Sequence, residues 1–164
     1  MTQAMDDRQI RLDRMRYVKN KASSRLCYLG ILLNVLYFVS IYKSDVASWY
    51  YQILVGGSIV YNLLFMLVVF LASEGVKNYQ KGYSYLLFAV GAMQVARIFI
   101  LPSQAHKAVV KISGTETVVM QNPQYWFVVA CLALSAACLI AAGYINLHKS
   151  RILEAHISAL KTAS

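Results

Sequence analysis

The stretch that decides the fold is YSYLLFAVGAMQVARIFIL, residues Tyr83–Leu101. It is long enough and apolar enough to cross the roughly 30 Å hydrocarbon core of a bilayer as a helix. Arg97 lies inside it and is the only charged residue within any such stretch of the chain. Because a charge facing lipid is costly, we expect this helix to turn Gln94 and Arg97 toward neighbouring helices.

Three other stretches share this length and apolar character: residues 26–42, 49–72 and 125–145. Of the 164 residues, 59% are hydrophobic and 14% are charged, whereas an average soluble domain is about half apolar and about a quarter charged. A helix pairs all its backbone groups internally, as a segment in lipid must. The sequence therefore predicts an all-α membrane protein, a bundle of four transmembrane helices.

The longest connection between predicted spans, residues 102–124, contains two short β-branched runs. AVVKIS at Ala108–Ser113 and ETVVMQ at Glu116–Gln121 flank Gly114-Thr115, a pattern typical of a β-hairpin. We therefore expect a short β-hairpin between spans three and four, and its valines are a candidate contact surface by strand addition.

The ends of the third and fourth spans are marked by different signals. Pro102 is expected to end span three, because proline has no backbone N–H to continue the helical ladder. After span four, residues 146–164 keep helical spacing at Leu153, Ile157 and Leu160. This spacing predicts a helical tail that continues the fourth helix into water.

Basic residues are distributed unevenly across the predicted spans. With both termini on one side, that side carries twelve Lys and Arg, whereas the other carries only Lys43, Lys107 and Lys111. The positive-inside rule then places both termini in the cytoplasm and the hairpin outside, in a plasma (inner) membrane. Residues 1–25 hold seven of the basic residues and are expected to contact anionic lipid headgroups, not nucleic acid.

Four polar residues fall at similar depths in the predicted spans: Asn34, Asn62, Gln94 and Ser135. Lipid offers them no hydrogen bonds, so they should face one another across the bundle. One interpretation is that they hold the helices together, at roughly 0.5–1.5 kcal/mol per contact. The other is a polar track for an ion or a small solute. The sequence favours the first, because a conducting path usually needs more polar residues along one line.

Arg97 has two interpretations of its own. As a structural residue it would snorkel to the outer interface, or pair with Asp45 to lock spans one and three. As a functional residue it would bind an anion or a lipid phosphate, since a guanidinium makes bidentate phosphate contacts. The candidate counter-charges are Asp45 and Glu116.

Small residues at helical spacing predict close helix packing. They are Ala92 and Ala96 in span three, and Ala133, Ala137 and Ala141 in span four. The spacing does not distinguish a neighbour within the chain from a helix of a partner subunit.

Signatures of catalysis and of bound cofactors are lacking in the sequence. The three cysteines form no CxxC pair, and His106, His148 and His156 all lie outside the predicted spans. We therefore expect no metal, no cofactor and no enzymatic activity.

The leading hypothesis is a small non-enzymatic membrane subunit or scaffold that packs against other membrane proteins or against copies of itself. The alternative is an oligomeric channel or carrier for a small anion or neutral solute, using Asn34, Asn62, Gln94 and Arg97. A third, weaker hypothesis is lipid handling, with Arg97 holding a headgroup.

Overall fold

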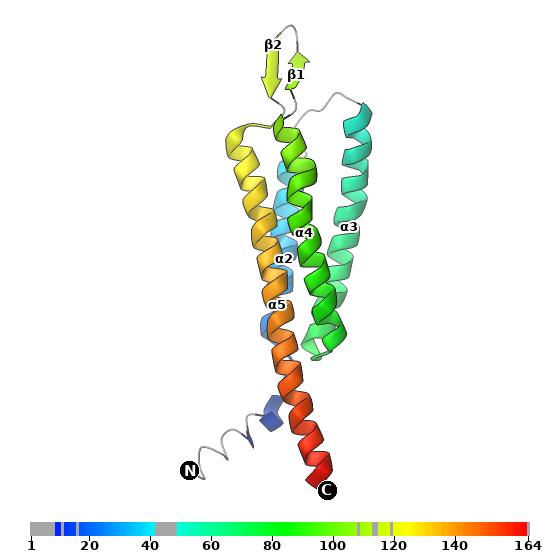
Figure 1. Ribbon diagram of the computed structural model, residues 1–164, viewed down its shortest axis with the longest axis vertical. Helices are drawn as coiled ribbons and strands as arrows, with labels where there is room; N and C mark the ends of the chain where they lie inside the picture. Colours follow the sequence, from blue (N-terminus) through cyan, green and yellow to red (C-terminus); the bar gives the residue numbers. More distant parts are fainter. Residues whose placement is uncertain are drawn as a thin grey trace.

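Four long helices make up most of the computed structural model (Figure 1), which describes residues 9–10, 12–15, 17–41, 49–107, 109–112, 115–118 and 120–163. They are α2 (Lys21–Ile41), α3 (Trp49–Lys77), α4 (Lys81–Lys107) and α5 (Asn122–Ala163). Each is long and apolar enough to cross a membrane. Together they form an elongated bundle, the helical architecture expected from the four apolar stretches.

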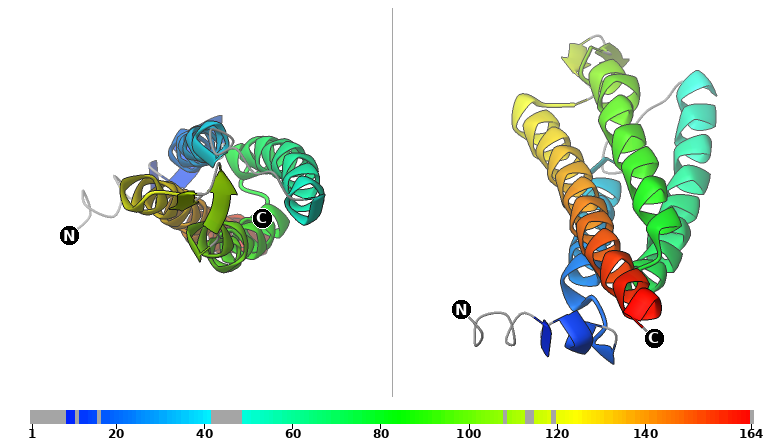
Figure 2. Two further views of the ribbon diagram at one scale, coloured as in Figure 1. Left: turned by 90° about the horizontal axis from the view of Figure 1, so that it is seen from above. Right: turned by 60° about the horizontal axis from the view of Figure 1, so that its bottom comes forward.

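Helix α5 is the central packing element of the bundle, because it contacts both α2 and α4 along much of their length. Helix α3 packs less closely and diverges from the other three helices toward its N-terminal end (Figures 1 and 2). A Cβ added at Gly56 or Gly57 would meet no atom within 4 Å apart from its chain neighbours and the nearby backbone of α3. The half of α3 that starts at Trp49 is therefore attached to the bundle less firmly than the half that ends at Lys77.

Glycines allow the close approach of α5 to its neighbours. A Cβ added at Gly143 would lie 3.1 Å from the backbone oxygen of Ser84, and one added at Gly91 would lie 2.9 Å from Cγ1 of Ile140. The contact between α2 and α5 is similarly tight, since a Cβ at Gly30 would lie 3.0 Å from the Leu139 side chain. Such contacts bring helix backbones together and increase dispersion attraction between them.

The buried apolar residues form two separate clusters. The larger one, here the lower core, lies toward the end of the bundle where α3 meets α4, and contains Cys27, Phe65, Val69, Ala72, Val76, Leu87, Val90, Leu139 and Ala142. The smaller one, the upper core, lies near the connection between α4 and α5 and contains Tyr37, Ala105, Met120, Val128, Cys131 and Leu132. The space between the two clusters is occupied by polar side chains.

Helix α4 does not end at Pro102, contrary to the expectation from its sequence, but continues to Lys107. Proline removes one backbone donor and bends a helix, but it does not end one whose next turn is held by packing. Ala105 is such an anchor, because it is buried in the upper core with Tyr37 and Met120.

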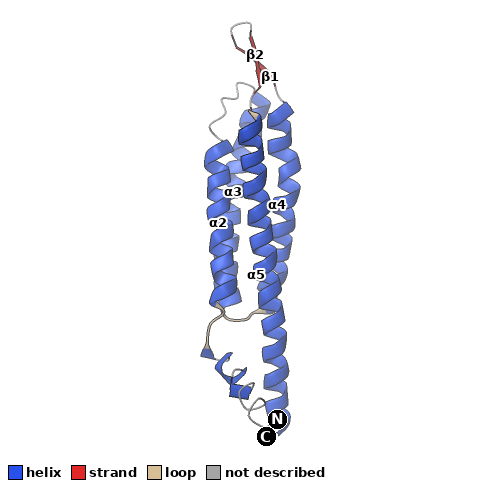
Figure 3. Ribbon diagram, turned by 90° about the vertical axis from the view of Figure 1, so that its left-hand side faces the viewer, coloured by secondary structure: helices blue, strands red, loops and turns tan. Residues whose placement is uncertain are grey.

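Two short antiparallel strands lie between α4 and α5, β1 (Val109–Ile112) and β2 (Thr115–Val118). Val109 pairs with Val118, and Ile112 pairs with Thr115. Thr115, expected in the turn of the 108–121 hairpin, belongs to β2, and Met120 and Gln121 are not in a strand, while residues 108, 113, 114 and 119 lie outside the described residues. The pair projects from one end of the bundle (Figure 3).

Helix α5 extends beyond the bundle at the opposite end and runs without a break to Ala163 (Figure 3). The described N-terminal residues lie at this same end, where Oδ1 of Asp13 and Nε2 of His156 are 2.8 Å apart. The first and last described segments of the chain are therefore neighbours.

Candidate functional site

Polar side chains gather where the four helices meet, between the upper and lower cores. They form the central cluster, which consists of Asn34 from α2, Ser58 and Asn62 from α3, Gln94 and Arg97 from α4, and Ser135 from α5. Each of these six side chains is at most 6% exposed. Every helix of the bundle therefore contributes to it.

The guanidinium of Arg97 lies at the centre of this cluster. Its Nη1 donates to Oδ1 of Asn62 at 2.9 Å and to Oδ1 of Asn34 at 3.3 Å, and its Nη2 donates to Oγ of Ser58 at 2.9 Å. The rings of Tyr37 and Tyr61 lie over the guanidinium, with centroids 4.4 and 4.6 Å from its carbon. Neutral oxygens and two aromatic rings thus stabilise a charge that would be costly in hydrocarbon.

The amides of the cluster also bond to one another. Asn34 Nδ2 donates to Asn62 Oδ1 at 3.0 Å, and Gln94 Nε2 donates to Asn34 Oδ1 at 3.1 Å. Ser135 connects α5 to α2, because its hydroxyl donates to the Gly30 carbonyl at 2.9 Å. Among the described residues, Oε1 of Gln94 is buried without a hydrogen-bond donor.

The cluster contains the polar residues singled out from the sequence, which are Asn34, Asn62, Gln94, Arg97 and Ser135. Arg97 does not snorkel toward the end of the bundle, as one interpretation expected. It is only 6% exposed, because acceptors on α2 and α3 at its own depth bind its Nη1 and Nη2. Asp45 and the side chain of Glu116 lie outside the described structure, so their role as counter-charges remains a prediction.

Three members of the site were missed from the sequence: Tyr37, Ser58 and Tyr61. Tyr37 follows Asn34 by three residues and Ser58 precedes Asn62 by four. Residues at these spacings share a helix face, so this signal was available. Tyr61 is adjacent to Asn62, and no spacing rule would have selected it.

A second group of polar side chains, the end cluster, closes the bundle at the end where α5 extends. It consists of Asn20, Ser23, Ser84, Asn146, Lys149 and Ser150. Asn146 is its hub: its Nδ2 donates to Ser84 Oγ at 2.8 Å, and its Oδ1 accepts from Asn20 Nδ2 at 3.3 Å. The backbone N–H of Asn20 donates to the Lys77 carbonyl at 3.0 Å, so this cluster joins the start of α2 to the end of α3.

The short turn from α3 to α4 completes this end of the bundle. Gln80 N donates to the Gly75 carbonyl at 3.2 Å and Tyr79 N donates to the Val76 carbonyl at 3.3 Å, the two bonds of a Schellman cap. Tyr79 takes the left-handed position of that cap, with φ at 57°. Burial raises the pKa of the Tyr79 hydroxyl above its ordinary value.

The lower core separates the central cluster from the end cluster. Gln94 follows Ser84 by ten residues in α4, and Asn146 follows Ser135 by eleven in α5, so the separation is about 15 Å along the helices. Leu87, Leu139 and the other side chains of the lower core fill this interval. The two polar clusters are therefore not joined into one polar line through the bundle.

The alanines expected to pack helices lie mostly on the outside. Ala92, Ala96, Ala133 and Ala137 are exposed, and Ala141 is half-buried. The close contacts within the chain use Gly30, Gly91 and Gly143 instead. A packing role for these alanines therefore stays a prediction. The helix that packs against their exposed face would have to belong to another subunit.

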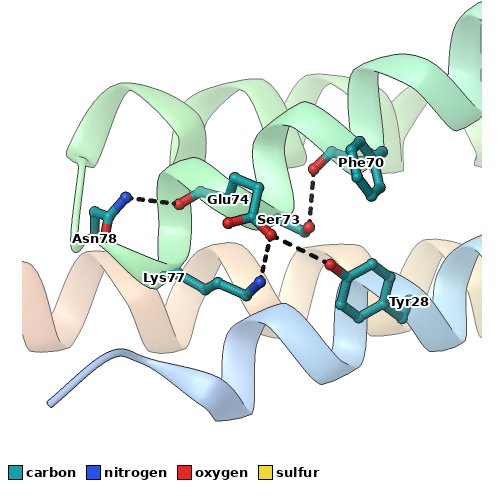
Figure 4. Close-up of polar contacts among 6 residues, drawn as sticks. All are labelled: Tyr28, Phe70, Ser73, Glu74, Lys77 and Asn78. Atoms are coloured by element: carbon teal, nitrogen blue, oxygen red, sulfur yellow. Dashed lines mark hydrogen bonds and ion pairs between the residues drawn. The ribbon is translucent and has the colours of Figure 1, made fainter.

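Charged side chains at the α5-extension end form ion pairs on the surface. Lys77 pairs with Glu74, which also accepts from the hydroxyl of Tyr28 (Figure 4), and Lys81 pairs with Glu154. Within the described part of the chain, no group of three or more His, Cys, Asp or Glu side chains could hold a metal ion.

Comparison with known proteins gives no relative. No protein-family model matches the chain, and no curated protein or solved structure matches it.

Proposed function

We propose that this protein is a small non-enzymatic membrane subunit, which packs through its outer helix faces against another membrane protein or another copy of itself. The proposal includes a plasma (inner) membrane location with both termini in the cytoplasm and the β1–β2 pair outside. The orientation is supported by the excess of Lys and Arg on the side of the termini.

The observation that carries this proposal is the apolar interval between the two polar clusters. A channel or carrier path needs polar groups along its whole length, because an unsolvated ion or solute is costly in an apolar layer. Here about 15 Å of side-chain packing, including Leu87 and Leu139, separates the central cluster from the end cluster. The central cluster is therefore better suited to joining helices than to conducting a solute.

The outer faces supply candidate contact surfaces. Exposed Ala133 and Ala137 lie four residues apart on α5, and exposed Ala92 and Ala96 are similarly spaced on α4. Small residues at this spacing allow another helix to approach closely in lipid. Within the described residues, β1 and β2 form a sheet of two strands, so the outer edge of either strand could bind a further strand from a partner.

The test is capture from native membranes with a cleavable cross-linker, followed by mass spectrometry. We expect wild-type protein to give a specific cross-linked product. The variant Ala133→Leu/Ala137→Leu should lose most of this product, because the larger leucine side chains prevent the close approach of a partner helix. Leu134→Ile, at another exposed apolar position of α5, is the control. A protein that stays strictly monomeric and captures nothing would contradict the proposal.

The second candidate is a carrier for a small anion or neutral solute, and one observation favours it. Oε1 of Gln94 is buried without a donor among the described residues, and Gln94 Nε2 and Arg97 Nη1 donate to the same acceptor, Asn34 Oδ1. Such a pair could bind a small molecule that both donates and accepts hydrogen bonds. Flux of a solute into proteoliposomes that is lost with Gln94→Leu would support this candidate over the subunit.

A further inference from the structure

The outward face of α2 carries basic residues at one end and apolar residues along the rest. Lys21 and Arg25 are exposed in its first two turns, and Leu29, Leu32 and Leu36 are 44%, 56% and 44% exposed. At 100° per residue, all five lie within an arc of about 80°. We call these five residues the α2 stripe.

The two cations of the α2 stripe have no carboxylate partner among the described side chains. Only three carboxylates are described, and each pairs elsewhere: Glu74 with Lys77, Glu154 with Lys81, and Asp13 with His156. Figure 4 shows that Glu74 is turned to Lys77 and Tyr28, along the side of α2 that meets α3. Among the described side chains, no carboxylate competes with an external anion for Lys21 or Arg25.

The position of the two cations fits the level of lipid headgroups. Asn20, immediately before α2, bonds to the Lys77 carbonyl at the end of α3, so Lys21 lies where the chain enters the apolar part of the bundle. Arg25 is one turn further in, and its long side chain can reach back toward that level. A phosphate bound by both residues would leave acyl chains to lie along the three leucines.

We propose that the α2 stripe is a binding site for an anionic phospholipid, whose phosphate contacts Lys21 and Arg25 and whose acyl chain packs on Leu29, Leu32 and Leu36. Charge complementarity identifies the headgroup, because a guanidinium and an ammonium together favour a phosphate oxygen. The exposed leucines identify the source as a lipid and not a free phosphate, since a soluble anion gains nothing from them. This inference goes beyond the proposed function and does not depend on a protein partner.

The test measures retention of phosphatidylglycerol by the purified protein, using native mass spectrometry, with phosphatidylcholine as the neutral competitor. Wild-type protein should retain phosphatidylglycerol preferentially. Lys21→Gln/Arg25→Gln should weaken its binding by about fivefold for each charge and roughly 25-fold for both. Lys21→Arg/Arg25→Lys, which keeps both charges, should retain the lipid.

Arg14→Gln/Arg151→Gln is the matched control, because it removes two exposed cations from the same end of the molecule but from outside the α2 stripe. It should leave the preference within about twofold of wild type, whereas an effect equal to that of the α2 variant would mean a diffuse charge effect and would overturn the proposal. Glycerol 1-phosphate should not displace the bound lipid; displacement at equal concentration would show that the acyl chain contributes nothing. Circular dichroism confirms that each variant is folded.

Discussion

Arg97 joins three helices through one side chain. It donates to Asn34 on α2 and to Ser58 and Asn62 on α3, and α3 has few other attachments near its N-terminal half. An ammonium is a point charge that cannot keep the same fork of hydrogen bonds or stack between two rings. The identity of this residue, and not only its charge, should therefore matter for stability.

We expect Arg97→Lys to lower the free energy of unfolding by about 2 kcal/mol and Arg97→Ala by about 3 kcal/mol, because buried acceptors lose their donors. Thermal unfolding in detergent, followed by circular dichroism, measures both. Lys107→Ala is the control, because Lys107 is exposed at the end of the same helix. Equal stability of all three variants would show that the central cluster does not hold the bundle together.

At the scale of elements, the contact between α4 and α5 depends on the absence of a side chain at Gly143. We expect Gly143→Val to destabilise the bundle by about 1–3 kcal/mol, because its Cβ would lie 3.1 Å from the Ser84 carbonyl oxygen, which belongs to a backbone and cannot rotate away. Ala137→Val on the exposed face of the same helix should be tolerated in detergent. Comparable losses from the two variants would mean that α5 does not pack as described.

The cap between α3 and α4 gives a second prediction for an element. Tyr79 has φ at 57°, a conformation that asparagine tolerates and β-branched residues avoid. We expect Tyr79→Val to cost about 1–2 kcal/mol, and Tyr79→Asn to cost less. Unfolding midpoints of the two variants decide this, and a valine variant as stable as the asparagine variant would argue against a left-handed cap.

At the scale of the whole molecule, the lower core should exclude water. Cys27 lies within it and is fully buried, so a water-soluble methanethiosulfonate reagent should not modify it in the folded protein. The measurement uses intact mass in a background of Cys131→Ala/Cys138→Ala, with Gln80→Cys in the exposed turn as the reactive control. A rate for Cys27 within about tenfold of the control would indicate a hydrated path, since buried thiols are otherwise inert.

The sequence predicted the four helices because a segment that crosses the hydrocarbon core must be about 20 residues long and mostly apolar, and both properties can be read directly from the sequence. It also predicted that Asn34, Asn62 and Gln94 would face one another, because lipid offers amides no hydrogen bonds. It did not predict that Arg97 would donate to Asn34 and Asn62, because it expected this side chain to snorkel or to pair with Asp45. The continuation of α4 past Pro102 was not predictable, since it depends on Ala105 packing against residues distant in sequence. For the same reason, alanine spacing did not distinguish outer faces from the contacts that α5 makes at Gly91 and Gly143.

The unbroken course of α5 has a mechanical consequence. With 42 residues it is about 63 Å long, whereas a bilayer with its headgroups is about 40–45 Å thick. From Ser135 to Ala163 the rod measures about 42 Å, so a tilt of about 10° at the central cluster would displace its free end by about 7 Å. A change in the tilt of α5 within the bilayer would therefore move the end of the helix, and any molecule bound to that end, beyond the membrane surface.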